Sequence, residues 1–176
     1  KPARTALVFA AVYISGAFLF FTLKYFSPAL DFPKAVADKQ TAFMQLEGGS
    51  GIKVRPLEPT LTGFIKNVPQ ALVNSTIRPF PSDIKHMLSL GVAVENFSFL
   101  LLIILYAFYK EKTNSPPTPF LWFGVFFAAS LLLTIGYTVN FQGAIVRYRS
   151  IVIPLILTPL VARINWKMIR ERLLNI

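Results

Sequence analysis

The sequence predicts an all-α integral membrane protein with about four transmembrane helices, and its composition and charge spacing carry that prediction. Of the 176 residues, 54% are hydrophobic and only 15% are charged, whereas soluble domains carry about 25% charged residues. The charges cluster between long apolar runs, and mean hydropathy is +0.55. Long uncharged runs of this kind are typical of helices whose solvent is lipid.

The composition also excludes several kinds of site. The chain has no cysteine, so disulfides, zinc thiolates and cysteine nucleophiles are excluded. Its one histidine, His86, cannot make a multi-histidine metal or haem site, and we expect it at a helix start or at the membrane interface. We therefore expect no cofactor and no metal.

Residues 1–28 are predicted to form the first transmembrane helix, from about Thr5 to Ser27, with Pro28 ending it. The run is too long for a signal-peptide core, and Lys24 is followed by bulky aromatics rather than a cleavage site. Because the chain starts at Lys1 and not Met, we expect a processed, shortened or partial product.

Residues 29–82 are predicted to form a long extracytoplasmic loop with helices of its own. Pro33 favours a short helix through Leu46, which the glycines of 48–51 would end, and 52–57 would be extended. Between Thr60 and Ile77, apolar residues recur at helical spacing, and Pro69 is expected to interrupt that helix. Such a helix lies either on the membrane surface or against the loop's own small core.

Residues 83–176 are predicted to hold three further transmembrane helices and a basic tail. The second span begins near Asp83 or His86, with Ser82 or Asp83 as its cap, and ends at Tyr109 before a short loop that includes Lys112 and the Pro116-Pro117 turn. The third lies within 120–146, and Gly143 is expected to mark a break near its end.

The fourth apolar run is short. Only 13 residues separate Arg149 from Arg163, and Pro154 and Pro159 lie among them. A helix of that length covers roughly 20 Å of a hydrocarbon core about 30 Å thick. The fourth span must therefore recruit flanking residues, thin the bilayer, or hold Arg147 and Arg149 against protein at membrane depth.

The distribution of basic residues predicts the topology. With an even number of spans, Arg4, Lys110 and the basic tail after Arg163 share one side, which the positive-inside rule assigns to the cytoplasm. We thus expect a bacterial inner-membrane protein with both termini cytoplasmic and loop 29–82 periplasmic. The net charge of +10 then suits anionic lipid contact, and no nucleic acid partner is expected.

Glu95 and Asn96 lie inside the second span, where a carboxylate costs about 2.5–3.5 kcal/mol to insert. Something must compensate for this cost. Either the two residues contact a substrate, a proton path or a partner, or they hold helices together by hydrogen bonds and ion pairs.

Arg147 and Arg149 stand at the outer end of the fourth span, against the usual charge bias. Because a guanidinium binds phosphate through parallel hydrogen bonds, the pair is a candidate site for a lipid phosphate. The alternatives are snorkelling to the lipid surface or pairing with Glu95, which lies roughly 13 Å below the outer end of its helix. On a regular helix, two arginines two apart point away from each other, so a shared ligand requires a broken backbone.

Two stretches resemble a known group of proteins. One comprises Gly48-Gly49-Ser50, 68–72, 77–81 and Val94-Glu95-Asn96-Phe97, and the other comprises 140–149 with Pro154 after it. They resemble the C-terminal part of uncharacterised polytopic inner-membrane proteins of Bacteroidetes-type bacteria that accompany surface-polysaccharide genes. The Arg-Tyr-Arg…Pro pattern is also similar to late segments of GT-C membrane glycosyltransferases. That second resemblance implies an acidic catalytic residue in an early outer loop, where Asp31 is the nearest by position.

Two functions remain open from the sequence, which shows no complete catalytic set and leans away from an enzyme. The first is a non-catalytic integral membrane subunit, or a fragment of one, that docks into a larger bacterial envelope assembly through its helices and outer loop. The alternative is a protein that handles polyprenyl-phosphate-linked glycan. The expected partners are accordingly membrane lipids, other membrane subunits and such a glycan.

Overall fold

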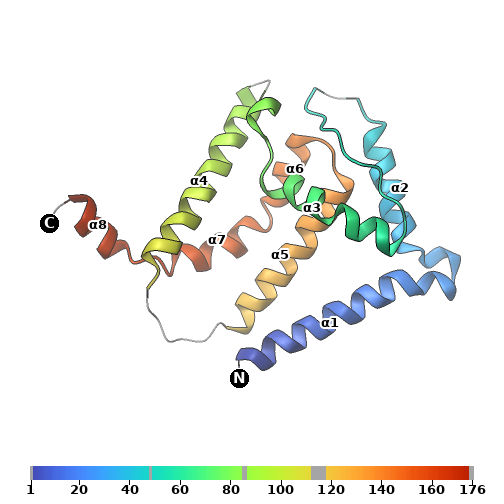
Figure 1. Ribbon diagram of the computed structural model, residues 1–176, viewed down its shortest axis with the longest axis horizontal. Helices are drawn as coiled ribbons and strands as arrows, with labels where there is room; N and C mark the ends of the chain where they lie inside the picture. The colour runs from blue at the N-terminus through green and yellow to red at the C-terminus, as the bar shows by residue number, and fades with distance from the viewer. Residues whose placement is uncertain (1, 48, 85–86, 112–117, 175–176) are drawn as a thin grey trace.

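The computed structural model describes residues 2–47, 49–84, 87–111 and 118–174. Within these ranges the chain forms helices and isolated β-bridges but no strand, which confirms the predicted all-α class. The elements are α1 (Pro2–Thr22), η1 (Leu23–Tyr25), η2 (Pro28–Leu30), α2 (Phe32–Met44), α3 (Leu61–Thr76), η3 (Pro81–Asp83), α4 (Met87–Tyr109), α5 (Pro119–Thr138), α6 (Gln142–Arg149), α7 (Ile153–Val161) and α8 (Trp166–Leu174) (Figure 1).

Three helical segments are long and apolar enough to cross a membrane: Arg4–Tyr25, Ser89–Tyr109 and Pro119–Thr138. A fourth crossing is formed if α6 and α7 count as one span, bent by 56° between them. Counted as one span, the bent pair would lengthen the short fourth apolar run, because α6 would supply flanking residues that α7 lacks.

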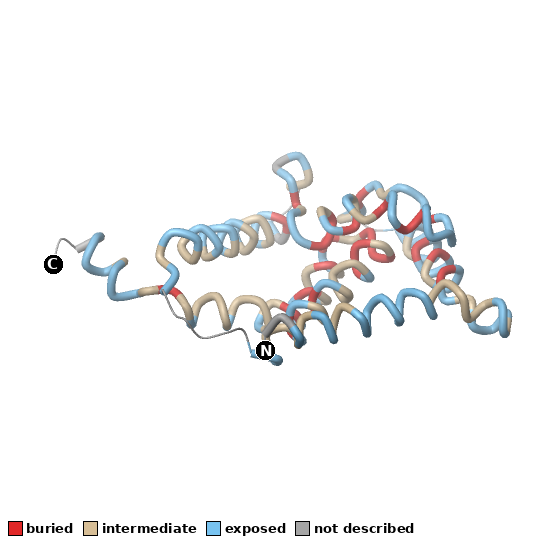
Figure 2. Tube along the Cα trace, turned by 60° about the horizontal axis from the view of Figure 1, so that its bottom comes forward, coloured by how far each residue is buried: buried red, intermediate tan, exposed pale blue. Residues whose placement is uncertain are grey.

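Helix α5 is the centre of the fold, and α1, α2, α3, α6 and α7 all contact it (Figure 1). Buried residues gather where α2, α3 and α6 meet the carboxyl end of α5, whereas α1 and α4 are largely uncovered (Figure 2). The core there consists of Ile52 from the loop together with Ile135, Val139 and Ile145. The loop and the membrane helices therefore share one core.

Helix α3 continues through Pro69, so the predicted interruption is wrong. Thr60 caps the helix by accepting a hydrogen bond from the Gly63 amide. A proline inside a helix costs roughly 3 kcal/mol. Packing offsets that cost, because α3 buries Phe64 and Ala71 and lies across α5.

The predicted break at Gly143 is also misplaced. Helix α5 already ends at Thr138, Val139 is extended, and Gly143 lies inside α6. The break falls earlier because the loop pairs with the backbone there: the Ile52 amide donates to the Asn140 carbonyl (2.7 Å) and the Gln142 amide to the Ser50 carbonyl (3.1 Å).

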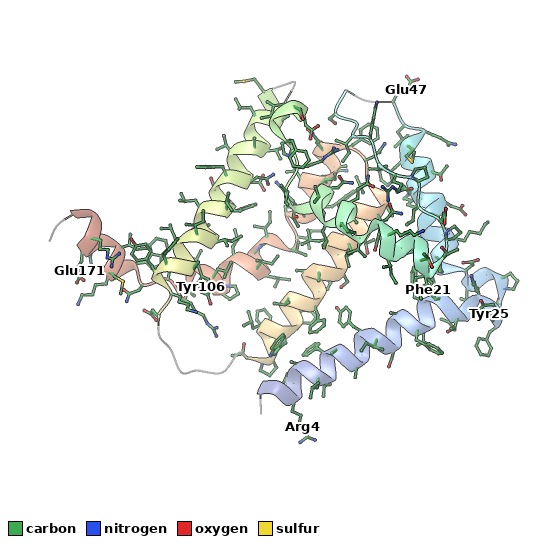
Figure 3. The ribbon with its side chains drawn as sticks, in the orientation of Figure 1. Arg4, Phe21, Tyr25, Glu47, Tyr106 and Glu171 are labelled. Atoms are coloured by element: carbon green, nitrogen blue, oxygen red, sulfur yellow. The ribbon has the colours of Figure 1, made fainter. Side chains whose placement is uncertain are left out.

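The opposite end of the molecule joins α4 to α7. The Glu111 amide donates to the Arg163 carbonyl (2.8 Å), and the Asn165 amide donates to the Tyr109 carbonyl (2.7 Å). Arg4 and Glu47 lie at opposite edges of the molecule (Figure 3). Arg4, one of the basic residues that the topology argument places on one side, is thus far from the Glu47 end of the loop.

Several sequence predictions fall on residues outside the described ranges. These residues are Lys1, Gly48, His86, Lys112, Pro116 and Pro117.

Gly136 makes the contact between α3 and α5 possible, because a Cβ at this position would overlap the Ala71 carbonyl. We expect Gly136→Ala to destabilise the protein by at least the ~1–3 kcal/mol typical of overpacking, since backbone must move to make room. Thermal unfolding in detergent, followed by circular dichroism, measures this as a lower Tm. Gly91→Ala in α4 is the control, because its Cβ would meet nothing within 4 Å. Equal Tm values for the two variants would contradict the close contact.

Candidate functional site

An ion pair between α4 and α6 is the centre of the candidate site. Arg149 Nη2 donates to Glu95 Oε1 at 3.3 Å, which confirms the predicted pairing of Glu95 with one of the two arginines. The Arg149 side chain is only 3% exposed, whereas that of Glu95 is 32% exposed. The carboxylate thus compensates the charge of a buried guanidinium inside a predicted span, as a membrane requires.

Helix α6 fixes this geometry. Arg149 is its last residue, and the bend into α7 follows directly. The guanidinium lies 6.0 Å from the ring centroid of Phe99, which is one turn beyond Glu95 on α4. Arg149 therefore links α4 to the bent span by both charge and ring contact.

Arg149 retains donors that the protein does not satisfy. Its Nε and Nη1 atoms are buried without a hydrogen-bond partner. The residue lines a cavity of about 160 Å³, together with Ser75 and Thr76 of α3 and apolar side chains of α4 and α7. A cavity of this size has room for water or for a small polar headgroup that supplies the acceptors.

Asn96, unlike Glu95, bonds to backbone carbonyls and not to a charged side chain. Its Nδ2 donates to the carbonyls of Ile77 (2.9 Å) and Arg78 (2.8 Å), so it ties the segment after α3 to α4. Asp83 accepts from the Phe80 amide (3.0 Å) and lies 3.5 Å from Arg78 Nε, while residues 85–86 of the helix start that it was predicted to cap lie outside the described ranges. The polar pair Glu95-Asn96 thus holds one helix to two separate parts of the chain.

The structure does not bring Arg147 and Arg149 together. Because the backbone of α6 is helical, Arg149 is buried while Arg147 is exposed, with its guanidinium 5.3 Å from the Tyr148 ring centroid. For both arginines to bind one phosphate, the backbone between them would have to be broken, whereas α6 is a continuous helix through Arg149. Phosphate binding remains a prediction for each arginine separately.

Asp31, the acidic residue suggested by resemblance, caps α2. Its Oδ1 accepts a hydrogen bond from the Lys34 amide at 3.0 Å. Among the described residues, no group of three or more His, Asp or Glu could hold a metal ion.

Sequence reasoning missed Gln40, which is 4% exposed in α2. Its Nε2 donates to the carbonyls of Arg55 (3.2 Å) and Tyr137 (2.8 Å), and its Oε1 accepts from the Leu57 amide (2.7 Å). The available signal was the stripe Pro33, Ala37 and Gln40, because a polar residue on the small, apolar face of a helix points to a buried partner.

Comparisons with protein-family models, with curated proteins and with solved structures give no match to this chain.

Removing one member of the ion pair should cost more than removing both. Loss of one partner from a fully buried pair costs about 3–5 kcal/mol, and the partial exposure of Glu95 reduces that figure here. We expect Glu95→Leu to lower the Tm in detergent and Glu95→Leu/Arg149→Met to recover most of the loss, since no uncompensated charge remains. Ser98→Ala on the same helix is the control. A double variant less stable than Glu95→Leu would contradict this account.

Proposed function

We propose that this chain is a non-catalytic integral membrane subunit, or a fragment of one, within a larger bacterial envelope assembly. The observation that carries the proposal is an uncovered apolar stripe on α3, outside the candidate spans. Leu61, Ile65 and Leu72 are 56%, 60% and 38% exposed, while the opposite face of α3 packs on α5. A rigidly held helix with an open apolar face suits docking to a membrane partner.

The role of the polar groups supports the same proposal. The intramembrane residues Glu95 and Asn96 contact Arg149 and the segment after α3, so they hold the fold together. The candidate spans α1 and α4 also leave their apolar faces open, to lipid or to other helices.

A second candidate function is the handling of a polyprenyl-phosphate-linked glycan. The unpartnered Nε and Nη1 of Arg149 favour it, because they offer donors to a headgroup in the adjoining cavity. The geometry supports docking better, since Arg147 points elsewhere.

Photo-crosslinking tests the docking proposal. A photoreactive amino acid at Ile65 should give discrete protein adducts in native membranes, because this side chain stands in the exposed stripe. The same group at Lys53, an exposed position outside the stripe, should give none. Lipid adducts alone from Ile65, or identical adducts from both positions, would argue against a partner on α3.

The proposed topology has both termini in the cytoplasm, with loop 29–82 in the periplasm and α3 at the outer interface. Because the chain has no native cysteine, single cysteines report accessibility directly. We expect Lys53→Cys to react with a membrane-impermeant maleimide in cells whose outer membrane alone is permeabilised. Lys167→Cys, whose parent side chain is 79% exposed, should react only after the inner membrane is opened. Labelling of both from one side would overturn this topology.

A further inference from the structure

A cavity beside α5, separate from the one that Arg149 lines, combines an apolar lining with the cation of Lys39. It has a volume of about 540 Å³ and is lined by residues of α2, α5 and α6 together with Phe20 of α1. Cavities of about 300–1,000 Å³ hold ligands of moderate size. The lining includes the Phe43 ring from the loop and the Tyr148 ring from α6.

A basic side chain lies over the face of each of these two rings. Lys39 Nζ lies 5.4 Å from the ring centroid of Phe43, and Arg147 Cζ lies 5.3 Å from that of Tyr148. In the described part of the chain, neither cation has a carboxylate within ion-pair distance, unlike Lys34 beside Asp38. Lys39, which lines the cavity, and Arg147, which lies over a ring that lines it, are therefore two positive charges without a carboxylate partner.

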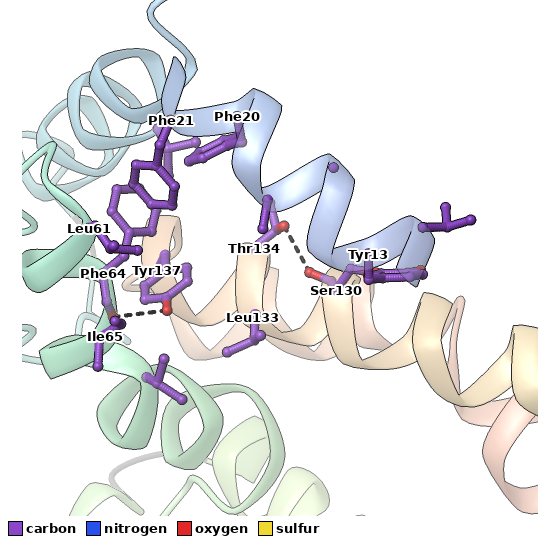
Figure 4. Close-up of a pocket in the computed structure, with 15 residues that line it drawn as sticks. Tyr13, Phe20, Phe21, Leu61, Phe64, Ile65, Ser130, Leu133, Thr134 and Tyr137 are labelled. Carbon is purple, nitrogen blue, oxygen red and sulfur yellow. Dashed lines mark hydrogen bonds between the residues drawn. The ribbon is translucent and has the colours of Figure 1, made fainter. Parts of the chain in front are cut away.

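The cavity extends from the loop into the membrane-spanning part of the fold. Its α5 lining runs from Thr138 at the helix end to Leu131, a rise of about 10 Å. It shares Phe20, Val36 and Thr134 with a cavity of about 660 Å³ between α1, α3 and α5. That larger cavity reaches the hydrogen-bonded pair of Tyr13 and Ser130, which lies about midway along α1 and α5 (Figure 4).

We propose that these two neighbouring cavities, which share three lining residues, together bind one membrane lipid with a phosphate headgroup. Lys39 and Arg147 hold the phosphate at the loop end, and the apolar chain runs along α5 past Phe20. The rings of Phe43 and Tyr148, over which the two cations lie, pack against the core at the carboxyl end of α5. The proposed topology puts headgroups at that end, and the apolar lining continues toward mid-span, which is the polarity of a lipid.

This inference does not rest on docking through α3, although Leu61 and Ile65 of the exposed stripe also line the 660 Å³ cavity. It gives Arg147 a phosphate partner without Arg149.

Native mass spectrometry of the purified full chain in detergent tests the proposal. The probes are phosphatidylglycerol, phosphatidylcholine with the same acyl chains, and farnesyl phosphate. We expect phosphatidylglycerol to be retained in preference to phosphatidylcholine, and Lys39→Gln/Arg147→Gln to reduce that retention by about tenfold. The matched control is Lys53→Gln/Arg55→Gln, which removes the same charges from exposed loop positions that line neither cavity.

A further variant separates the cavity from the charges. Ala35→Trp fills the mouth of the 540 Å³ cavity at an exposed position and should lower retention with both cations intact. Farnesyl phosphate bound with the same dependence on Lys39 and Arg147 supports a site for phosphate on an apolar chain of either kind. Equal retention of the two phospholipids, or equal loss in the variant and its charge-matched control, would overturn the proposal. Unchanged circular dichroism establishes that each variant is folded.

Discussion

Backbone groups released where a helix ends near lipid must find partners within the protein, and this constraint organises the whole structure. The end of α5 frees the carbonyls of Tyr137 and Asn140, which accept hydrogen bonds from Gln40 and from the Ile52 amide. The segment after α3 frees the carbonyls of Ile77 and Arg78, and Asn96 donates to both. The long loop is therefore folded against the spans because the spans need its donors.

This arrangement explains which parts of the fold the sequence could predict. Long apolar runs give α1, α4 and α5 because lipid imposes length and composition on each span separately. The spacing of apolar residues likewise gives α3. The end of α5 could not be found this way, since it depends on pairing with residues 50–52, about ninety residues earlier in the chain.

The candidate site shows the same division. Glu95 and Arg149 stand out in sequence because an isolated charge at membrane depth requires a partner, and the structure pairs them. Arg147 stands out for the same reason, but its direction depends on α6 being a regular helix. Gln40 and Gly136 give no charge signal, because their importance comes from the carbonyls of Tyr137 and Ala71 that lie beside them.

The ion pair between Arg149 and Glu95 connects α4 to the 56° bend between α6 and α7. Arg149 lies at the bend, paired with Glu95 of α4, while Asn165 in the segment after α7 donates to the carbonyl of Tyr109 at the end of α4. The bent pair of helices α6 and α7 thus contacts α4 at the bend and again just after α7. A change in the tilt of α4 would be transmitted to the bend, and from there to the small cavity that Arg149 lines.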